Sequence, residues 1–105
     1  MKRSPTSETS HDWSDEEIHA AVKAYLWMLE HEIENRPYSK AGVNLFLREG
    51  YLKNRSKGAV EYRMQNISAA LEELCLPRIK GFVPAKNLGT SVRDKIRHYL
   101  IEEGV

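Results

Sequence analysis

The sequence predicts an all-α fold: a compact bundle of about four helices, with a connector punctuated by proline and glycine before the last helix. Apolar residues recur at helical spacing in four segments, and a serine or threonine stands before each of them. No segment alternates apolar and polar residues convincingly, as strands do. A chain of 105 residues with 41% hydrophobic residues has the length and composition of one folded domain.

Residues 1–12 are rich in serine, threonine and charge without periodicity, which predicts a disordered tail before a single helical domain over 13–105. Ser14 and Glu17 have the spacing of a capping box that opens the first helix, and Trp13 can pack against an apolar residue of its first turn. The helix is expected to end at Arg36-Pro37, because the residue before proline avoids the helical region. Its apolar stripe consists of Ile18, Val22, Tyr25, Leu26, Leu29 and Ile33.

Two further helices follow, each behind a serine. Ser39 is the expected cap of a short helix that stops at Gly50, and its apolar residues are Val43, Leu45, Phe46 and Leu47. Ser56 is the expected cap of the third helix, which Pro77 closes. The third helix has the clearest apolar stripe of the chain, made of Val60, Met64, Ile67, Leu71 and Leu74.

The connector over 78–89 is too short and too rich in proline and glycine for another helix. We expect its apolar residues to enter the core while its cations stay outside: Ile79, Phe82, Val83 and Leu88. Thr90 or Ser91 then caps the fourth helix, and Gly104 stops it. The inward residues of this helix are Val92, Ile96, Tyr99 and Leu100.

The sequence predicts no enzyme, no metal and no cofactor. Cys75 lies among leucines, so we expect a buried and unreactive thiol. The four histidines show none of the close helical spacings that metal ligands favour. Neighbouring glutamates diverge on a helix, and the glycines lack the spacing of phosphate-binding loops.

The location expected from the sequence is the cytoplasm. No apolar run approaches the ~18 residues that span a bilayer, and no hydrophobic stretch follows the basic start, so neither a membrane partner nor a secretory signal is expected. A single cysteine fits a reducing compartment.

Charge is distributed unevenly along the chain. Residues 1–35 carry a net charge of −5, whereas residues 36–97 hold thirteen basic and five acidic residues, a net charge of +8. This segment predicts DNA binding if its cations share a face, and an ordinary solvated surface if they are paired with the acidic first helix. The residues expected to contact phosphates are Arg55, Lys57, Arg63, Arg78, Lys80 and Lys86.

Two amides beside these cations suggest base readout. Gln65 and Asn66 have side chains that can pair with adenine in a major groove. The second and third helices would then form a helix-turn-helix, although the segment from Gly50 to Ser56 is longer than the usual tight turn.

Most of the chain after residue 12 resembles a known family. The stretch WSDEEIHAAVKAYLWMLEHE and the segment 55–100 resemble the small helical domain at the N-termini of McrA-like, HNH-type restriction endonucleases, which cut modified DNA. The matching features are the tryptophan at the first helix start, Arg55-Ser56, Asn66-Ile67-Ser68-Ala69 and the Pro77…Gly81-Phe82…Pro84…Asn87 connector.

The resemblance implies an accessory domain that associates with DNA in a restriction or defence system. This sequence has no His/Asn/His metal site of the HNH type, so the domain would act alone or with a separately encoded nuclease. The contact residues named above come from charge and not from the resemblance.

A second hypothesis is a protein-interaction adaptor or inhibitor that docks through the first helix. This helix is acidic, and Trp27 and Met28 lie off its apolar stripe. If they are exposed, they can contact a partner protein.

Overall fold

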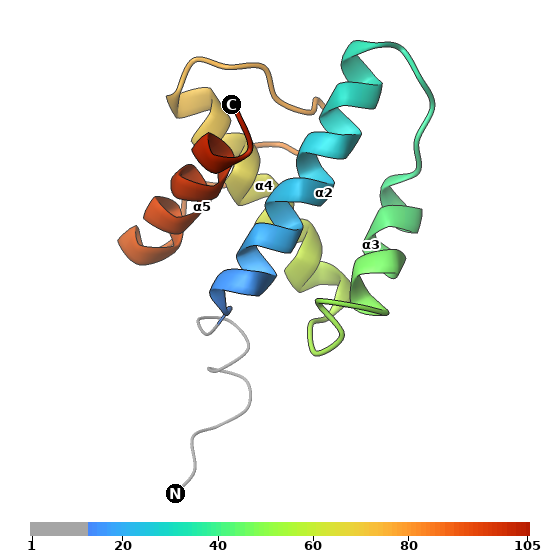
Figure 1. Ribbon diagram of the computed structural model, residues 1–105, viewed down its shortest axis with the longest axis horizontal. Coiled ribbons are helices and arrows are strands. Elements are labelled where there is room, and N and C mark those ends of the chain that lie inside the picture. Colours follow the sequence, from blue (N-terminus) through green and yellow to red (C-terminus); the bar gives the residue numbers. More distant parts are fainter. Residues whose placement is uncertain (1–12) are drawn as a thin grey trace, which may run out of the picture.

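The computed structural model of the protein describes residues 13–105, which are all-α as the sequence predicts (Figure 1). The tail predicted for residues 1–12 lies outside the described residues. Four helices make up the described part: α2 (Asp15–Ile33), α3 (Lys40–Arg48), α4 (Lys57–Glu73) and α5 (Thr90–Glu102). The predicted fold class is therefore confirmed for this part of the chain.

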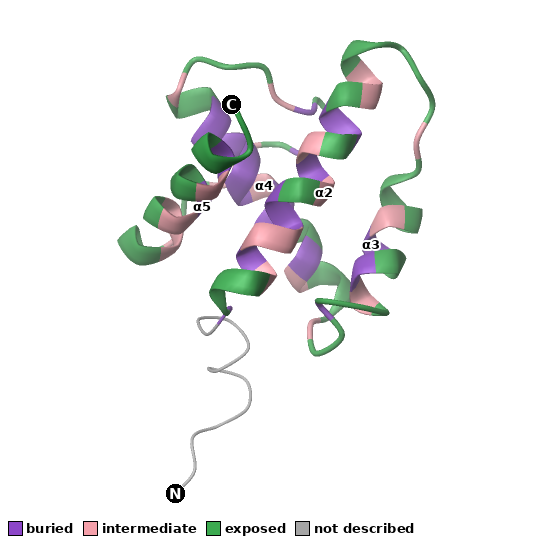
Figure 2. Cartoon of the chain, in the orientation of Figure 1, coloured by how far each residue is buried: buried purple, intermediate pink, exposed green. Residues whose placement is uncertain are grey.

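The helix α4 lies at the centre of the bundle. It packs against α2, α3 and α5, and α3 and α5 lie on opposite sides of the pair formed by α2 and α4 (Figure 1). More than half of its 17 residues are buried (Figure 2). The stripe from Val60 to Leu71 faces the core, and Ala69, on the opposite side of the helix, is buried as well. A helix covered on so much of its circumference is part of the core.

Three of the four helices begin as the sequence predicts. Ser14 and Glu17 form the reciprocal capping box, with an Oγ–N distance of 3.1 Å and an Oε1–N distance of 2.8 Å. The hydroxyls of Ser39 and Ser56 likewise accept hydrogen bonds from the first turns of α3 and α4. For α5 the prediction was wrong: Gly89 is the N-cap and no side chain caps this helix.

The ends of α2 and α4 depend on left-handed residues that the sequence analysis overlooked. Asn35 and Cys75 have φ values of 61° and 59°. In each case the amide of the following residue bonds a carbonyl five residues back, which is a Schellman motif. The helices therefore stop before Pro37 and Pro77 can act. Cys75 is exposed, because its backbone reverses the chain at the surface, so the expected burial of its thiol was wrong.

One hydrophobic core joins all four helices and the connector. Ile79 and Phe82 of the connector are buried as expected, but Val83 is 62% exposed. On α2 the buried face is rotated from the predicted stripe: Met28 is buried, and Ile33, in the last turn, is 63% exposed. Since α2 contacts three other helices, tertiary packing rather than the sequence stripe alone decides which of its sides is covered.

The connector is fixed to α2 at its start. The backbone amide of Ile79 donates to the hydroxyl of Tyr25 over 2.8 Å, and that of Lys80 donates to a carboxylate oxygen of Glu32 over 3.0 Å. Burial raises the pKa of Tyr25, whose hydroxyl also hydrogen-bonds Ser68 on α4. The start of the connector is thus held to α2 by one buried and one exposed hydrogen bond.

Candidate functional site

Two of the predicted phosphate-binding residues lie against the indole of Trp13. The guanidinium carbons of Arg55 and Arg63 are 5.0 Å and 4.6 Å from its ring centroid. Arg55 also donates from Nε and Nη2 to the two carboxylate oxygens of Glu17, over 2.9 Å and 2.8 Å. The side chains of Arg55 and Glu17 are only 7% and 15% exposed. This arrangement joins the start of α2 to the start of α4 and leaves little of Arg55 for a ligand.

The electrostatics of this cluster follow from burial and charge pairing. Burial raises the pKa of Glu17, but the hydrogen bonds from Arg55 and Ser14 outweigh it and hold the pKa below its ordinary value. Burial, together with the positive charge of Arg55, lowers the pKa of Arg63. Arg63 is 6% exposed, and its Nε has no hydrogen-bond partner among the described residues. These guanidinium groups serve the fold.

Asn66, predicted to read a base, instead connects two internal groups. It is 1% exposed; its Oδ1 accepts from Nη1 of Arg63 over 2.9 Å, and its Nδ2 donates to the carbonyl of Ala85 over 2.6 Å. The neighbouring Gln65 is half-buried, and its backbone carbonyl accepts from the amide of Ala85. Asn66 thus holds the connector through its side-chain amide and Gln65 through its backbone carbonyl, and of the two side chains only that of Gln65 has access to solvent.

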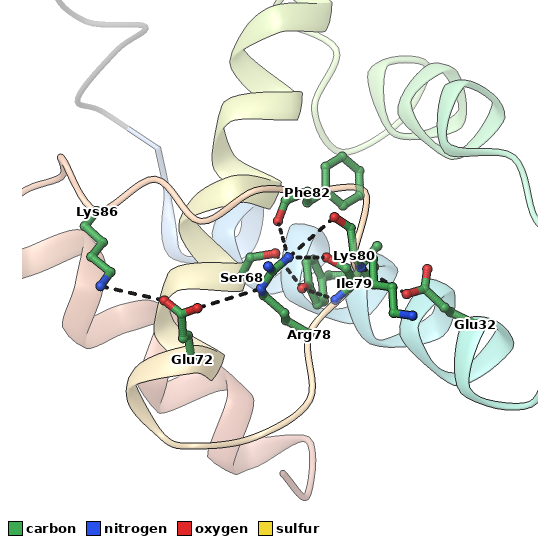
Figure 3. A network of polar contacts seen from close by, with 9 residues as sticks. Glu32, Ser68, Glu72, Arg78, Ile79, Lys80, Phe82 and Lys86 are labelled. Atoms are coloured by element: carbon green, nitrogen blue, oxygen red, sulfur yellow. Dashed lines mark hydrogen bonds and ion pairs between the residues drawn. The ribbon is translucent and has the colours of Figure 1, made fainter.

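Arg78 closes the turn at the start of the connector. Its Nη1 lies 3.0 Å, 3.5 Å and 3.4 Å from the carbonyl oxygens of Ile79, Lys80 and Phe82, and Figure 3 shows the guanidinium pointing into this turn. Glu72 of α4 lies 3.9 Å from its Nε, and the other oxygen of this carboxylate is 3.7 Å from Nζ of Lys86. One acidic residue therefore lies between two of the predicted DNA contacts.

The eight predicted residues do not form one patch. Lys57 and Glu72, the partner of Lys86, are fifteen residues apart on α4, which corresponds to a rise of about 22 Å. The exposed residues of α4 include three acids, namely Glu61, Glu72 and Glu73. More than half of α4 is buried and acids lie among its exposed residues, which argues against this helix as a reader of bases in a major groove. The predicted contacts that reach solvent freely are Lys57, Lys80, Lys86 and part of Gln65.

A different surface feature lies between α2 and α3. A hollow of about 480 Å³ is lined almost entirely by apolar atoms, and it adjoins a second of about 420 Å³ with a more polar lining. Ala24 and Phe46 belong to both, so we treat them as one groove, the α2/α3 groove. The residues of its apolar part are Ala24, Trp27, Ser39, Gly42, Val43 and Phe46.

Three aromatic side chains of the groove are open to solvent. Trp27, Phe46 and Tyr51 are 49%, 74% and 72% exposed. The ring of Trp27 lies 3.9 Å from that of His31, whose Nδ1 is 2.8 Å from the carbonyl oxygen of Trp27. This contact holds the indole in place without a ligand. These three side chains make the groove a candidate contact surface.

The sequence indicated this groove only in part. Trp27 was singled out because it lies off the stripe of α2, whereas Phe46 was named only among the apolar residues of the short helix. The signal for the groove is that α3 has apolar residues around more of its circumference than one buried face needs. Only Leu47 among its apolar residues is fully buried.

The described residues form neither a metal site nor a membrane-spanning helix. Within residues 13–105 no three histidine, cysteine, aspartate or glutamate residues lie together as a metal site requires. None of the described helices combines the length and apolar character needed to cross a bilayer.

No family model, curated protein or solved structure that was compared with the chain matches it. The resemblance to the endonuclease domain therefore stays a prediction. What the site does must be argued from its geometry.

Proposed function

We propose that this protein is an interaction module that binds an apolar surface of a partner protein in the α2/α3 groove. The observation that carries the proposal is the exposure of Phe46 and Trp27 beside an apolar hollow. Aromatic side chains beside a pocket are typical of the few residues that dominate a protein interface. A separately encoded nuclease of a restriction or defence system is the partner that the family resemblance implies.

The energetics favour a protein partner. Phe46 leaves about three quarters of its surface in water. Burying a large apolar side chain gains about 1.5–3 kcal/mol, so covering Phe46 and Trp27 together supplies a substantial share of a micromolar affinity, about 8 kcal/mol. The groove also has the form that takes an apolar helix face in known helix-in-groove complexes.

We expect Phe46→Ser and Trp27→Ala each to weaken partner binding by about 30-fold, the effect typical of a central aromatic residue. The measurement is affinity capture by the immobilised full chain from cells that express it naturally, followed by titration of the captured protein. Because both side chains are exposed, circular dichroism of the variants should match that of the original chain.

Ile101→Ser is the matched control, since Ile101 is 64% exposed on α5, away from the groove. It should leave capture unchanged. Equal capture by the groove variants and the original chain, or loss of capture in the Ile101 variant alone, would rule out the groove as the binding surface.

DNA binding is a second candidate, and one observation favours it. Lys80 and Lys86 are exposed on a connector that buried hydrogen bonds fix to α2 and α4, so their positions are set without DNA. Lys57 adds an exposed cation at the N-terminus of α4, the end of a helix that favours phosphate. The interface would be small and would contact phosphates more than bases.

With three such contacts, log affinity should fall with log salt concentration at a slope of about −3, and not the −5 that six cations would give. Fluorescence anisotropy with a duplex probe measures this slope. The triple variant Lys57→Ala, Lys80→Ala and Lys86→Ala should abolish binding, whereas Lys23→Ala on α2 should not. Salt-independent binding, or binding that survives the triple variant, would contradict this second function.

A further inference from the structure

We infer that the groove accommodates a second copy of this chain, so that the protein forms a two-fold symmetric dimer through α2 and α3. This inference rests on the proposed function of the groove as a docking surface. It concerns which protein occupies the groove when the chain is alone in solution.

The shape of the α2/α3 groove favours a second copy as its occupant. Phe46 lines both hollows of the groove and is 74% exposed, so it projects between two recesses. A two-fold axis beside Phe46 can place this ring of each copy against a recess of the other, which a self-complementary interface requires.

The dimensions agree with this arrangement. The α2 wall of the groove runs from Glu16 to Trp27, which is about 16 Å of helix. The helix α3 has nine residues and is about 13 Å long. The α3 helix of one copy therefore fits along the groove of the other, with its Phe46 in the apolar hollow.

The charges in the polar part of the groove can pair with those of a second copy. The polar part of the groove carries one acid and one cation on α2, Glu16 and Lys23, and neither pairs with another described residue. A docking surface of one sign repels its own copy, whereas a surface with both signs can present each to the other. Two antiparallel α2 helices that cross near Ala20, which lies midway between them, bring Glu16 of each copy toward Lys23 of the other.

The test is the mass of the full chain in solution, measured by light scattering and sedimentation equilibrium between about 1 and 200 µM. We expect a concentration-dependent rise toward twice the 12.1 kDa of one chain. Phe46→Ser should weaken association at least tenfold, and the control Ile101→Ser should not change it. A monomer at 200 µM, or a dimer that Phe46→Ser leaves intact, would overturn the inference.

Reversing the charges of Glu16 and Lys23 distinguishes a lost interface from a misfolded chain. Glu16→Lys and Lys23→Glu should each weaken the dimer, and the double variant should restore it, because the pair is reversed and not removed. Failure of the double variant to recover would count against the antiparallel arrangement. If the chain is monomeric but the groove variants still lose partner capture, the dimer is excluded and the proposed function stands. If neither self-association nor partner capture depends on the groove, the dimer and the proposed function are both excluded.

Discussion

Replacing Glu17 by alanine is expected to lower the free energy of unfolding by about 3 kcal/mol. Glu17 accepts both hydrogen bonds from Arg55 and closes the capping box of α2 with Ser14. Its removal takes from the Arg55 side chain, 7% exposed, the carboxylate that accepts its Nε and Nη2 hydrogen bonds. For a domain of this size, 3 kcal/mol corresponds to a fall in Tm of about 15 °C, which differential scanning calorimetry measures directly.

Glu16→Ala is the matched control, because Glu16 lies in the same first turn of α2 but is exposed and unpaired among the described residues. It should cost less than about 0.5 kcal/mol. Equal destabilisation by the two variants would show that the Arg55–Glu17 pair does not stabilise the fold.

The pH dependence of this pair has a defined sign. Because the folded protein holds the pKa of Glu17 below its ordinary value of 4.5, the stabilisation is fully present above pH 4.5 and is lost as the pH falls through the folded pKa. The difference in stability between the original chain and Glu17→Ala should therefore narrow below pH 4.5. If the difference in stability between the two proteins stays constant below pH 4.5, the charge of Glu17 is not the cause of the stabilisation.

Much of the fold could be predicted from the sequence because its signals are local. Ser14, Ser39 and Ser56 cap helices through hydrogen bonds to amides two or three residues away, so the sequence alone determines them. The apolar stripe of α4 was likewise visible from spacing. The left-handed ends at Asn35 and Cys75 have the same local geometry. Asparagine tolerates this conformation and could have indicated the first end, whereas the residue type of Cys75 does not indicate the second.

The candidate DNA site could not be predicted in the same way, because a cation becomes internal only through residues distant in sequence. Arg55 and Arg63 face inward since Trp13, more than forty residues earlier, offers them its ring. Asn66 is buried because the connector folds back and presents the carbonyl of Ala85 to it. Net charge along a segment therefore overestimated the charge on the surface.

In the α2/α3 groove, by contrast, an apolar side chain lies at the surface. Phe46 was predicted only as one of the apolar residues of the short helix, and apolar character alone does not determine whether a side chain faces inward. The helix α3 packs against α2 and α4 but lies at the outside of the bundle, so only one side of it is covered. The exposure of Phe46 follows from this position and not from the composition of α3.

Replacing Asn66 by alanine is expected to cost about 3 kcal/mol of stability. The substitution removes the acceptor of Arg63 Nη1 and the donor to the carbonyl of Ala85, and both groups are left in a buried setting. Leaving a buried polar group without a partner costs about 1–3 kcal/mol, and more for a charged one. Chemical denaturation followed by tryptophan fluorescence, which Trp13 reports from the same cluster, measures the loss.

Gln65→Ala provides the contrast, because Gln65 contacts the connector only through its backbone carbonyl, which alanine retains. It should change stability by less than about 0.5 kcal/mol. The two variants also distinguish a role in folding from a role in recognition. If Asn66 reads a base, Asn66→Ala should lose DNA affinity and remain as stable as the original chain. We expect the reverse, a destabilised Asn66→Ala variant whose remaining folded fraction binds DNA as the original chain does, since its buried amide holds Arg63 and the connector in place.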